Sequence, residues 1–508
     1  MLALSGLSIF FLYTWISFIL APLAGDIKIF LASAKQASYL SPSLIVGSIR
    51  VWELKSVLSR MLAYFLYKIG VLFAPFNSPT AEIIVKAVYS LLLIGVIYTA
   101  MRLVFGKKCL WATVAAATLF MASSTDCHLQ VEMTGSLLIL LAFALYLNAI
   151  FTEKRSLWKL IGAGMLIGLV FWLKSILLLL SVSVVAAVCI ILTEEGRKLS
   201  FKRMMTVVCG SLISLAVVAG LVALINPDEF QEILNAGEYQ GSFFNPRIMW
   251  RESAGKFLAG HAEKPLFIPA VLLGFVCLIA NLIRCIREKK GRQVFFHLVL
   301  WLMPALFLLI SDYYFNYHFA AFLFPAVFEV WDLLRHRTRG REILLTGAAV
   351  LAAGWYAVLF SVFSRNVQTF MRLDREAYAN NTAFLESIDF DPEETVLYLD
   401  DGSGAYTLGN PSHLKYFFPL PLNRLQEESS MPCHVESLEK TMNYDGKYIS
   451  VYDLWFFGQW RWRYTQIQEK IDAEYELIGS YDVFSPPHVL LPTDDIEITR
   501  LELYQRKQ

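Results

Sequence analysis

Eleven long apolar runs limit what this chain can fold into, because each is close to the ~20 residues that a helix needs to cross a bilayer. Hydrophobic residues make up 56% of the 508 residues and charged residues 17%, and the mean hydropathy is +0.51. Such a composition is too apolar for a soluble protein of this length. We therefore predict a polytopic α-helical membrane protein with about 11 transmembrane helices. The predicted spans are 2–23, 82–105, 109–124, 133–151, 158–173, 175–194, 204–226, 266–285, 294–310, 318–334 and 343–363.

Basic residues between the spans predict the orientation of the chain. They gather in five short connections, at 107–108, 154–155, 197–203, 284–292 and 335–341. All five are cytoplasmic if the N-terminus is cytoplasmic and 24–81 stays outside, as the positive-inside rule requires. We therefore expect a multi-pass protein of the plasma (inner) membrane, with 24–81, 125–132, 227–265, 311–317 and the residues after 364 on the extracytoplasmic side. The first span lacks a preceding basic region and is interpreted as an uncleaved anchor.

Net charge and cysteine content say little about the function of the chain. The net charge is +1, and no basic patch indicates a nucleic-acid partner. Five of the seven cysteines lie in or beside apolar spans. Cys127 and Cys433 are the two that could form an extracytoplasmic disulfide, but their spacing fits no disulfide framework.

Segment 57–75 is long enough to span but contains Arg60 and Lys68. Counting it as a crossing would move all five basic connections outside. We therefore predict an amphipathic helix at the outer interface, with Arg60 and Lys68 on its water-facing side. A shallow or re-entrant span remains an alternative.

The composition becomes polar near residue 365, which divides the chain into a transmembrane module (1–364) and an extracytoplasmic domain (365–508). Strands are predicted at 395–399, at 447–451 and near 475–483 and 497–505, with a helix at 463–474. This order indicates a small α/β domain. The turn at 400–404 lacks G-x-G-x-x-G spacing and is predicted to be an ordinary strand-to-helix turn rather than a phosphate loop.

Asp26 follows the first span at the water boundary. Apolar residues at helical spacing predict a surface helix over 26–38, and a carboxylate at its start is favoured by the helix dipole. In this place Asp26 could act as a general base that an aqueous acceptor and a membrane-borne donor both reach. The alternative is that Asp26 only marks the end of the span.

Glu132 follows a second outer loop and opens the next predicted span. It could cap the helix, orient an acceptor or hold a metal, with Asp126 and His128 as further ligands. No His or Cys spacing favours a metal site here.

Further residues could bind a phosphate or a sugar. Lys174 lies in the middle of the apolar stretch 157–194, at a hairpin apex or buried, where it could pair with a lipid phosphate or simply end a span. Tyr317 and His318 stand at an outer turn and could contact phosphate or sugar, or belong to the aromatic belt. Arg247 and Arg251 lie in loop 227–265, where aromatic residues and arginines could bind a polar ligand.

These features together resemble the GT-C superfamily of membrane glycosyltransferases, in particular protein O-mannosyltransferases and bacterial aminoarabinose transferases. The resemblance rests on a D-x-x-x-F-x-x-x-A segment from Asp26, on Glu132, on Lys174 within W-L-K-S, and on Tyr317-His318 with Pro325 downstream. It implies a polyprenyl-phosphate sugar donor, Asp26 as general base, Glu132 as a second acidic position, and phosphate-facing roles for Lys174 and His318. Two departures are Ile27-Lys28 after Asp26, where an extra carboxylate is common, and a missing Pro-Pro-Leu-type segment.

The predicted reaction is a single displacement with inversion, in which an acceptor hydroxyl on a glycan, lipid or protein replaces the lipid phosphate. The sequence identifies no cofactor and leaves open a divalent ion between Asp26 and Glu132. The rival function is a flippase or transporter of lipid-linked saccharides. A transporter would favour charged groups near mid-bilayer and repeated halves, and neither is visible in the sequence.

Overall fold

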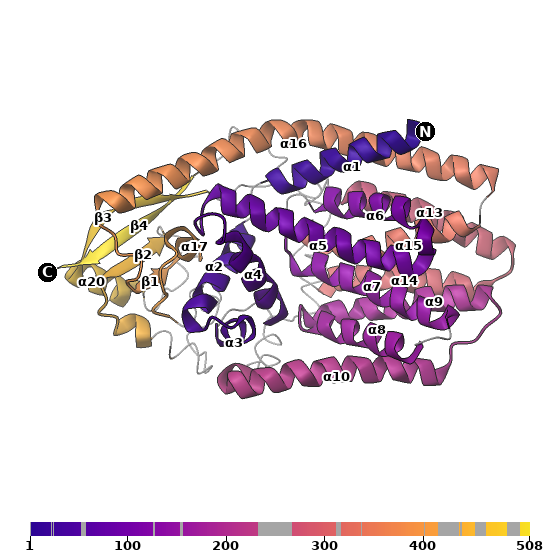
Figure 1. Ribbon diagram of the computed structural model, residues 1–508, viewed down its shortest axis with the longest axis horizontal. Helices are drawn as coiled ribbons and strands as arrows, with labels where there is room; N and C mark the ends of the chain where they lie inside the picture. Colours follow the sequence, from indigo (N-terminus) through magenta and orange to yellow (C-terminus); the bar gives the residue numbers. More distant parts are fainter. Residues whose placement is uncertain are drawn as a thin grey trace. The chain divides into compact units, whose positions relative to one another are not determined.

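The computed structural model describes residues 2–21, 23, 25–51, 57–124, 128–152, 156–231, 267–310, 316–336, 338–400, 402–414, 436, 439–452, 464–484 and 498–507. The chain forms two compact units. Unit 1 comprises Met1–Ile19 and Val88–Arg365, and unit 2 comprises Leu20–Ala87 and Asn366–Gln508. Helices predominate in the first, and a small sheet belongs to the second (Figure 1).

The helices of unit 1 coincide with the predicted spans, so the prediction of a polytopic helical membrane protein is confirmed. Within the described residues, seven helices are long and apolar enough to cross a membrane, and three shorter apolar helices accompany them. The total number of crossings stays a prediction. The helices, some of which continue into unit 2, are α1 (Leu2–Leu20), α5 (Pro79–Phe105), η1 (Gly106–Lys108), α6 (Leu110–Ser123), α7 (Val131–Phe151), α8 (Ser156–Phe171), η2 (Ser175–Leu178), α9 (Leu179–Glu194), α10 (Phe201–Ile225), α13 (Ile268–Arg287), α14 (Gly291–Ile310), η4 (Asn316–Phe322), α15 (Leu323–Arg335) and α16 (Arg339–Ser387).

Glycines bring α8 and α10 into close contact. A Cβ atom added at Gly164 would overlap the carbonyl oxygen of Val207, and one added at Gly210 would overlap that of Ile161. Ser211 Oγ donates a hydrogen bond to the Gly164 carbonyl at 2.9 Å. Small residues are the usual means by which membrane helices approach each other, because lipid offers no hydrophobic driving force between them.

Gly164→Ala is therefore expected to lower the free energy of unfolding by about 1–3 kcal/mol, since the new methyl group must push the helix backbones apart. Gly162→Ala is the matched control, because a Cβ there meets only Leu145 Cδ1 at an ordinary 3.8 Å. The denaturation midpoints of both variants in detergent would check this. Equal midpoints would contradict the close packing of α8 on α10.

Unit 2 contains a four-stranded sheet of order β1-β2-β4-β3, in which β1 and β2 are parallel and the other pairs antiparallel. The strands are β1 (Val396–Leu399), β2 (Tyr448–Tyr452), β3 (Tyr475–Val483) and β4 (Thr499–Arg506), and α17 (Ser403–Leu408) and α20 (Tyr464–Glu474) connect them. Ile467 and Ile471 of α20 pack on Leu397 and Ile449 of the sheet. The predicted C-terminal α/β domain is confirmed, with each strand and the helix within a few residues of its predicted place.

The turn after β1 is an ordinary strand-to-helix turn, as predicted. The buried Asp400 carboxylate accepts hydrogen bonds from the backbone N–H groups of Gly402 and Gly404, at 2.7 and 3.3 Å. It thus fills the place that a phosphate would take at the start of α17. Gly402 has φ +89°, a left-handed conformation that favours glycine.

Segment 57–75 forms α4 (Val57–Gly70), which at 14 residues is short for a span. Lys68 is exposed, as predicted, and lies over the Tyr64 ring at 5.2 Å. The prediction for Arg60 was wrong: the residue is 1% exposed, and its guanidinium donates to the carbonyl of Val51. Val51 is the C-cap of α3 (Leu44–Arg50), so Arg60 satisfies a helix terminus instead of facing water.

The first connection is bound to the C-terminal domain within unit 2. Helix α2 (Gly25–Leu40) presents Gln36, whose amide donates to the Asn410 carbonyl at 2.7 Å and accepts from the Ser412 N–H at 2.8 Å. Tyr39 of the same helix donates to the Gly409 carbonyl at 2.7 Å. Residues 370–376 positions apart in sequence therefore share one packed unit, and α2 carries Asp26.

Candidate functional site

Three of the predicted site residues meet in unit 1. Lys174 Nζ lies 2.7 Å from Glu132 Oε1 and 3.1 Å from His318 Nε2, and His318 Nε2 lies 3.4 Å from the same carboxylate oxygen. We call Glu132, Lys174 and His318 the Glu132 cluster. Its members come from the first turn of α7, the connection between α8 and η2, and η4, so three separate chain segments form it.

Local packing fixes the geometry of the Glu132 cluster. One turn beyond Glu132, Ser136 Oγ donates to the Ala320 carbonyl at 2.7 Å, which ties α7 to η4. Phe307 of α14 contacts two members: its ring centroid is 5.7 Å from that of His318 and 5.6 Å from Lys174 Nζ. Phe307 could not be recognised from the sequence, because an aromatic residue near the end of an apolar span resembles any other core residue.

Burial is uneven across the Glu132 cluster. The side chains of Glu132 and His318 are 1% and 3% exposed, whereas that of Lys174 is 33% exposed. Glu132 Oε1 is occupied by Lys174 and His318, but Oε2 is buried and, among the described residues, has no hydrogen-bond partner. A buried carboxylate oxygen without a partner is costly, and a bound hydroxyl group would satisfy it. The cluster therefore offers an accessible cation beside an acceptor ready for a ligand.

Asp26 is the second residue of α2, in the helical first turn where the sequence placed it, but its side chain is outside the described part of the structure. Lys28, two residues on, anchors this turn within unit 2. Its Nζ lies 3.0 Å from Asp374 Oδ1, 3.4 Å from Glu82 Oε1 and 2.9 Å from the Phe484 carbonyl oxygen. Burial alone would lower the pKa of Lys28, but the charges of Asp374 and Glu82 outweigh burial and raise it. Lys28 is thus a buried cation that holds the helix bearing Asp26.

The remaining predicted residues are not brought to the Glu132 cluster by any described contact. Tyr317 lies in η4, and its side chain is outside the described part of the structure. Arg247 and Arg251, and also Asp126, Cys127 and Cys433, are outside the described residues altogether. His128 is buried, with Nε2 2.6 Å from the Phe18 carbonyl oxygen and its ring 4.3 Å from the Phe18 ring. His128 thus packs the loop before α7 against α1.

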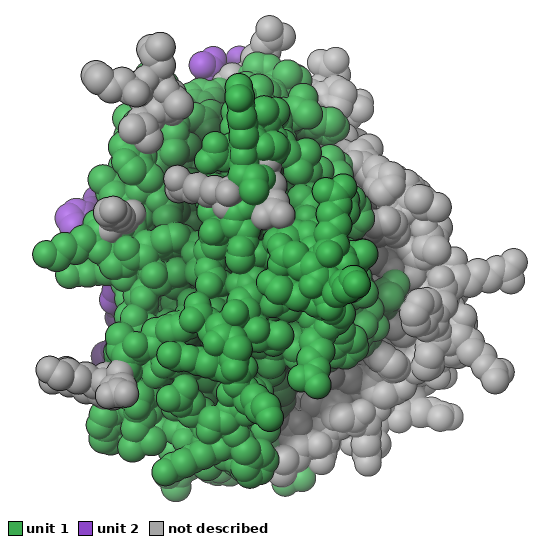
Figure 2. Space-filling view, turned by 90° about the vertical axis from the view of Figure 1, so that its right-hand side faces the viewer, with its two compact units in different colours: residues 1–19, 88–365 green, residues 20–87, 366–508 purple. Residues whose placement is uncertain are grey.

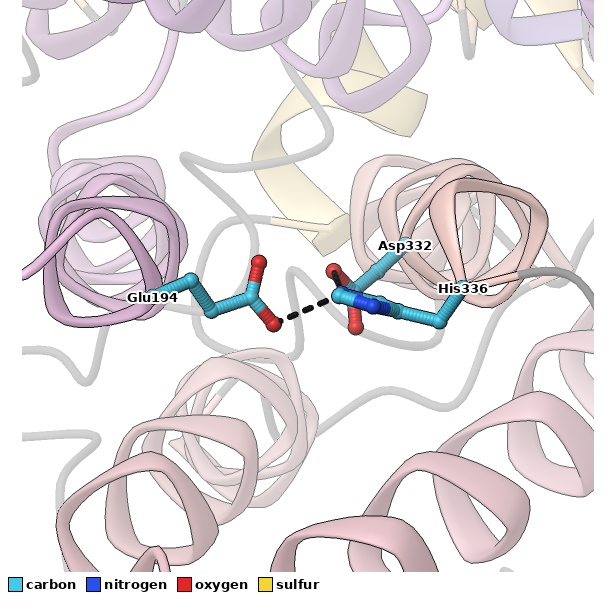
Figure 3. A group of neighbouring side chains, drawn as sticks. All are labelled: Glu194, Asp332 and His336. Atoms are coloured by element: carbon cyan, nitrogen blue, oxygen red, sulfur yellow. Dashed lines mark hydrogen bonds and ion pairs between the residues drawn. The ribbon is translucent and has the colours of Figure 1, made fainter.

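A second polar group, drawn in Figure 3, lies at the C-terminal ends of α9 and α15, the helices that follow η2 and η4. Glu194 ends α9, while Asp332 and His336 lie in and just after the last turn of α15, and the three offer ligand atoms within 4.8 Å of one another. Two arginines form ion pairs with these carboxylates. Arg284 Nη2 is 3.0 Å from Glu194 Oε1 and 2.8 Å from Asp332 Oδ2. Arg335 Nη1 is 3.1 Å from Glu194 Oε2. We call these five residues the Arg284 network. Since guanidinium groups already balance both carboxylates, the network is better explained as a structural ion cluster than as a metal site.

Residues 60–223 match the family model described as dolichyl-phosphate-mannose-protein mannosyltransferase. The crystal structure of ArnT from Cupriavidus metallidurans bound to undecaprenyl phosphate is similar over 98% of this chain and 96% of that chain, with 14% identity and a TM-score of 0.51. The apo Archaeoglobus fulgidus oligosaccharyltransferase is similar over 98% of this chain and 76% of that chain, with 12% identity and a TM-score of 0.50. No match was found among curated proteins.

The chain has the GT-C fold. At these identities the similar structures establish the fold, and the family model adds a sequence match that includes Glu132 and Lys174. The solved structures and the family model thus agree on the GT-C fold, and the sequence match extends over residues 60–223. In this GT-C fold the Glu132 cluster occupies helix ends of unit 1, and the Arg284 network occupies the opposite ends.

Proposed function

We propose that the protein transfers a sugar from a polyprenyl-phosphate donor to the hydroxyl group of an extracytoplasmic acceptor, with inversion at the anomeric carbon. The observation that carries the proposal is the Glu132 cluster, in which a partly exposed ammonium group and a histidine converge on a buried carboxylate. This arrangement suits a phosphate that must be bound at the membrane surface. The fold and the match to a mannosyltransferase family model support a glycosyl donor carried by a lipid phosphate.

In the proposed reaction Asp26 accepts the proton of the acceptor hydroxyl group, whose oxygen attacks the anomeric carbon. The new carbon–oxygen bond forms as the bond from the anomeric carbon to the phosphate oxygen breaks, and the polyprenyl phosphate leaves with the bonding electrons. Lys174 and His318 stabilise the charge that develops on the phosphate. Glu132 keeps Lys174 and His318 in place, and its Oε2 accepts a hydrogen bond from a sugar or acceptor hydroxyl group. Since a phosphate is a good leaving group, the reaction needs no strong general acid.

We further propose that the active site and the C-terminal domain face the extracytoplasmic side of the plasma membrane. The basic connections at 107–108, 154–155, 197–203, 284–292 and 335–341 support this orientation. Tyr317, Arg247 and Arg251 would contact the sugar or the acceptor on that side. Experiment would establish whether the acceptor is a glycan, a lipid or a protein.

The experiment measures release of free polyprenyl phosphate from a panel of polyprenyl-phosphate sugars by the purified protein with crude acceptor extract. Release that depends on the extract, with transfer of the sugar, would support the transferase. Binding of a donor without turnover, together with its movement between the leaflets of a vesicle, would instead establish the flippase function.

Lys174→Met is expected to lower release of polyprenyl phosphate by about 10²–10³-fold, because the methionine fills a similar volume but cannot stabilise the leaving phosphate. Lys159→Met is a control from the preceding helix: Lys159 bonds to Asn148 at 2.6 Å, away from the Glu132 cluster. The measurement is the initial rate at saturating donor, with unfolding followed in parallel. Full activity of Lys174→Met would remove Lys174 from the reaction.

A further inference from the structure

An apolar cavity of about 190 Å³ lies within unit 1, between α5, α6, α7, α13 and α15. Almost all of its lining is hydrocarbon. It has no part in the Glu132 cluster, and the proposed reaction does not use it. A dry cavity lined by aliphatic and aromatic groups is a poor site for water, which needs polar partners, and a good one for a hydrocarbon chain.

The two walls of the cavity differ. Aromatic rings form one wall: Phe143 lies 5.4 Å from Phe324 and 5.6 Å from Phe328, and Phe328 lies 5.6 Å from Trp331. The facing wall is formed by small residues on one side of α6, among them Ala115 and Ala116. Larger side chains on α6 would fill this space, so the sequence of α6 keeps it open.

The cavity reaches the surface of unit 1. Ala115 and Leu334 line it and are exposed, whereas Ala116 is buried. Ala115 belongs to the apolar helix α6, and Leu334 lies near the end of α15 in the predicted span 318–334, so we expect the opening to face lipid chains. Figure 2 shows one face of unit 1, drawn in green.

The cavity extends to the ends of the helices opposite the Glu132 cluster. On α7 its lining begins at Leu140, eight residues and so about 12 Å beyond Glu132. On α5 it reaches Phe105, the last residue of that helix. Its contents would therefore lie in the leaflet remote from the proposed transfer site.

Basic residues lie close in sequence to the lining residues at this end of the cavity. Lys107 is exposed and follows Phe105 by two residues. The Phe105 ring lies 6.3 Å from that of Trp331, over which the Arg335 guanidinium is placed at 5.0 Å. Arg335 also belongs to the Arg284 network, so Lys107 is the cation better suited to an added anion. A basic residue beside an apolar cavity at a membrane interface matches a lipid with a negatively charged headgroup.

We propose that this cavity binds one acyl chain of an anionic phospholipid, whose phosphate group lies beside Lys107. The polyprenyl tail of the donor is a less suitable occupant, because the donor phosphate is proposed to bind at Lys174 and these basic residues lie at the opposite helix ends. The lipid would fill the space between α6 and α15 and stabilise the membrane unit. This inference concerns a structural lipid, and its preference over the donor tail rests on the proposed binding of the donor phosphate at Lys174.

The test uses native mass spectrometry of the full-length, delipidated protein titrated with dioleoyl phosphatidylglycerol or with phosphatidylcholine of the same chains. We expect one phosphatidylglycerol molecule to be retained more strongly than phosphatidylcholine. Ala115→Phe should weaken its retention about tenfold, because the ring displaces part of the chain. Lys107→Gln should weaken the retention of phosphatidylglycerol about fivefold and leave the retention of phosphatidylcholine unchanged.

Ala216→Phe is the matched control, since Ala216 is an exposed alanine on α10, outside the cavity. This variant should retain phosphatidylglycerol as strongly as the wild type. Wild-type retention by Ala115→Phe would overturn the cavity as the site. Equal retention of the two lipids, or no effect of Lys107→Gln, would overturn the anionic headgroup. Displacement of phosphatidylglycerol by a polyprenyl phosphate in the wild type but not in Ala115→Phe would assign the cavity to the donor tail and overturn the proposal.

Discussion

Asp26→Asn is expected to lower the release of polyprenyl phosphate by about 10²–10⁴-fold, because the amide has nearly the same shape but cannot accept the acceptor proton. The loss should appear in the maximal rate more than in donor binding, since the donor phosphate is proposed to contact Lys174 and His318. Initial rates over a range of donor concentrations would separate the two effects.

Asp389→Asn is the control for Asp26→Asn. It makes the same substitution in unit 2 at an exposed position with φ +50°, a conformation that asparagine tolerates well. We expect this variant to keep full activity. Equal turnover by Asp26→Asn and the wild type would remove Asp26 from the mechanism while leaving the Glu132 cluster as the proposed phosphate site.

Arg284→Met is expected to lower the free energy of unfolding by about 3–5 kcal/mol. Arg284 and Asp332 are almost fully buried, and the arginine also holds Glu194. Removing the guanidinium takes the closest counter-charge from the buried Asp332, whereas Glu194 keeps Arg335. Burial of a charge without its partner costs far more than the loss of an exposed pair. Denaturation in detergent, followed by circular dichroism, measures the effect.

Arg287→Met is the matched control on the same helix, because Arg287 lies one turn further along α13 and is exposed. Arg287→Met is expected to lower the free energy of unfolding by less than about 1 kcal/mol. Adding Asp332→Asn to Arg284→Met should recover part of the lost stability, since it removes the uncompensated charge. If Arg284→Met and Arg287→Met were equally stable, the buried Arg284 network would not contribute to folding.

Much of the fold could be predicted from local patterns. A membrane span is a continuous apolar run, and a strand such as 396–399 is a short apolar run bounded by turn residues, so both are visible within a single window of sequence. Glu132, Lys174 and His318 could be named as candidates for a related reason, because each is a polar residue at the end of an apolar run. Their roles in catalysis stay proposals, as do those of Asp26, Tyr317, Arg247 and Arg251.

Side-chain direction on a short amphipathic helix could not be predicted in the same way. Arg60 and Lys68 are both basic residues on α4, yet one is buried against the end of α3 and the other is exposed. The difference depends on which neighbouring backbone carbonyl lacks a partner, and the sequence of α4 does not contain that information.

The sequence by itself determined the helical membrane architecture and the C-terminal α/β domain, because hydrophobic burial and backbone hydrogen bonding act through regular, local spacing. Only the tertiary structure decided which distant residues meet. It joined Glu132 to Lys174 and His318, placed Phe307 against two of them, bound α2 to the C-terminal domain through Gln36, and paired Arg284 with Glu194 and Asp332. Each of these contacts satisfies a buried polar or charged group, and its partner is chosen by the packing of whole helices rather than by the residues beside it in the chain.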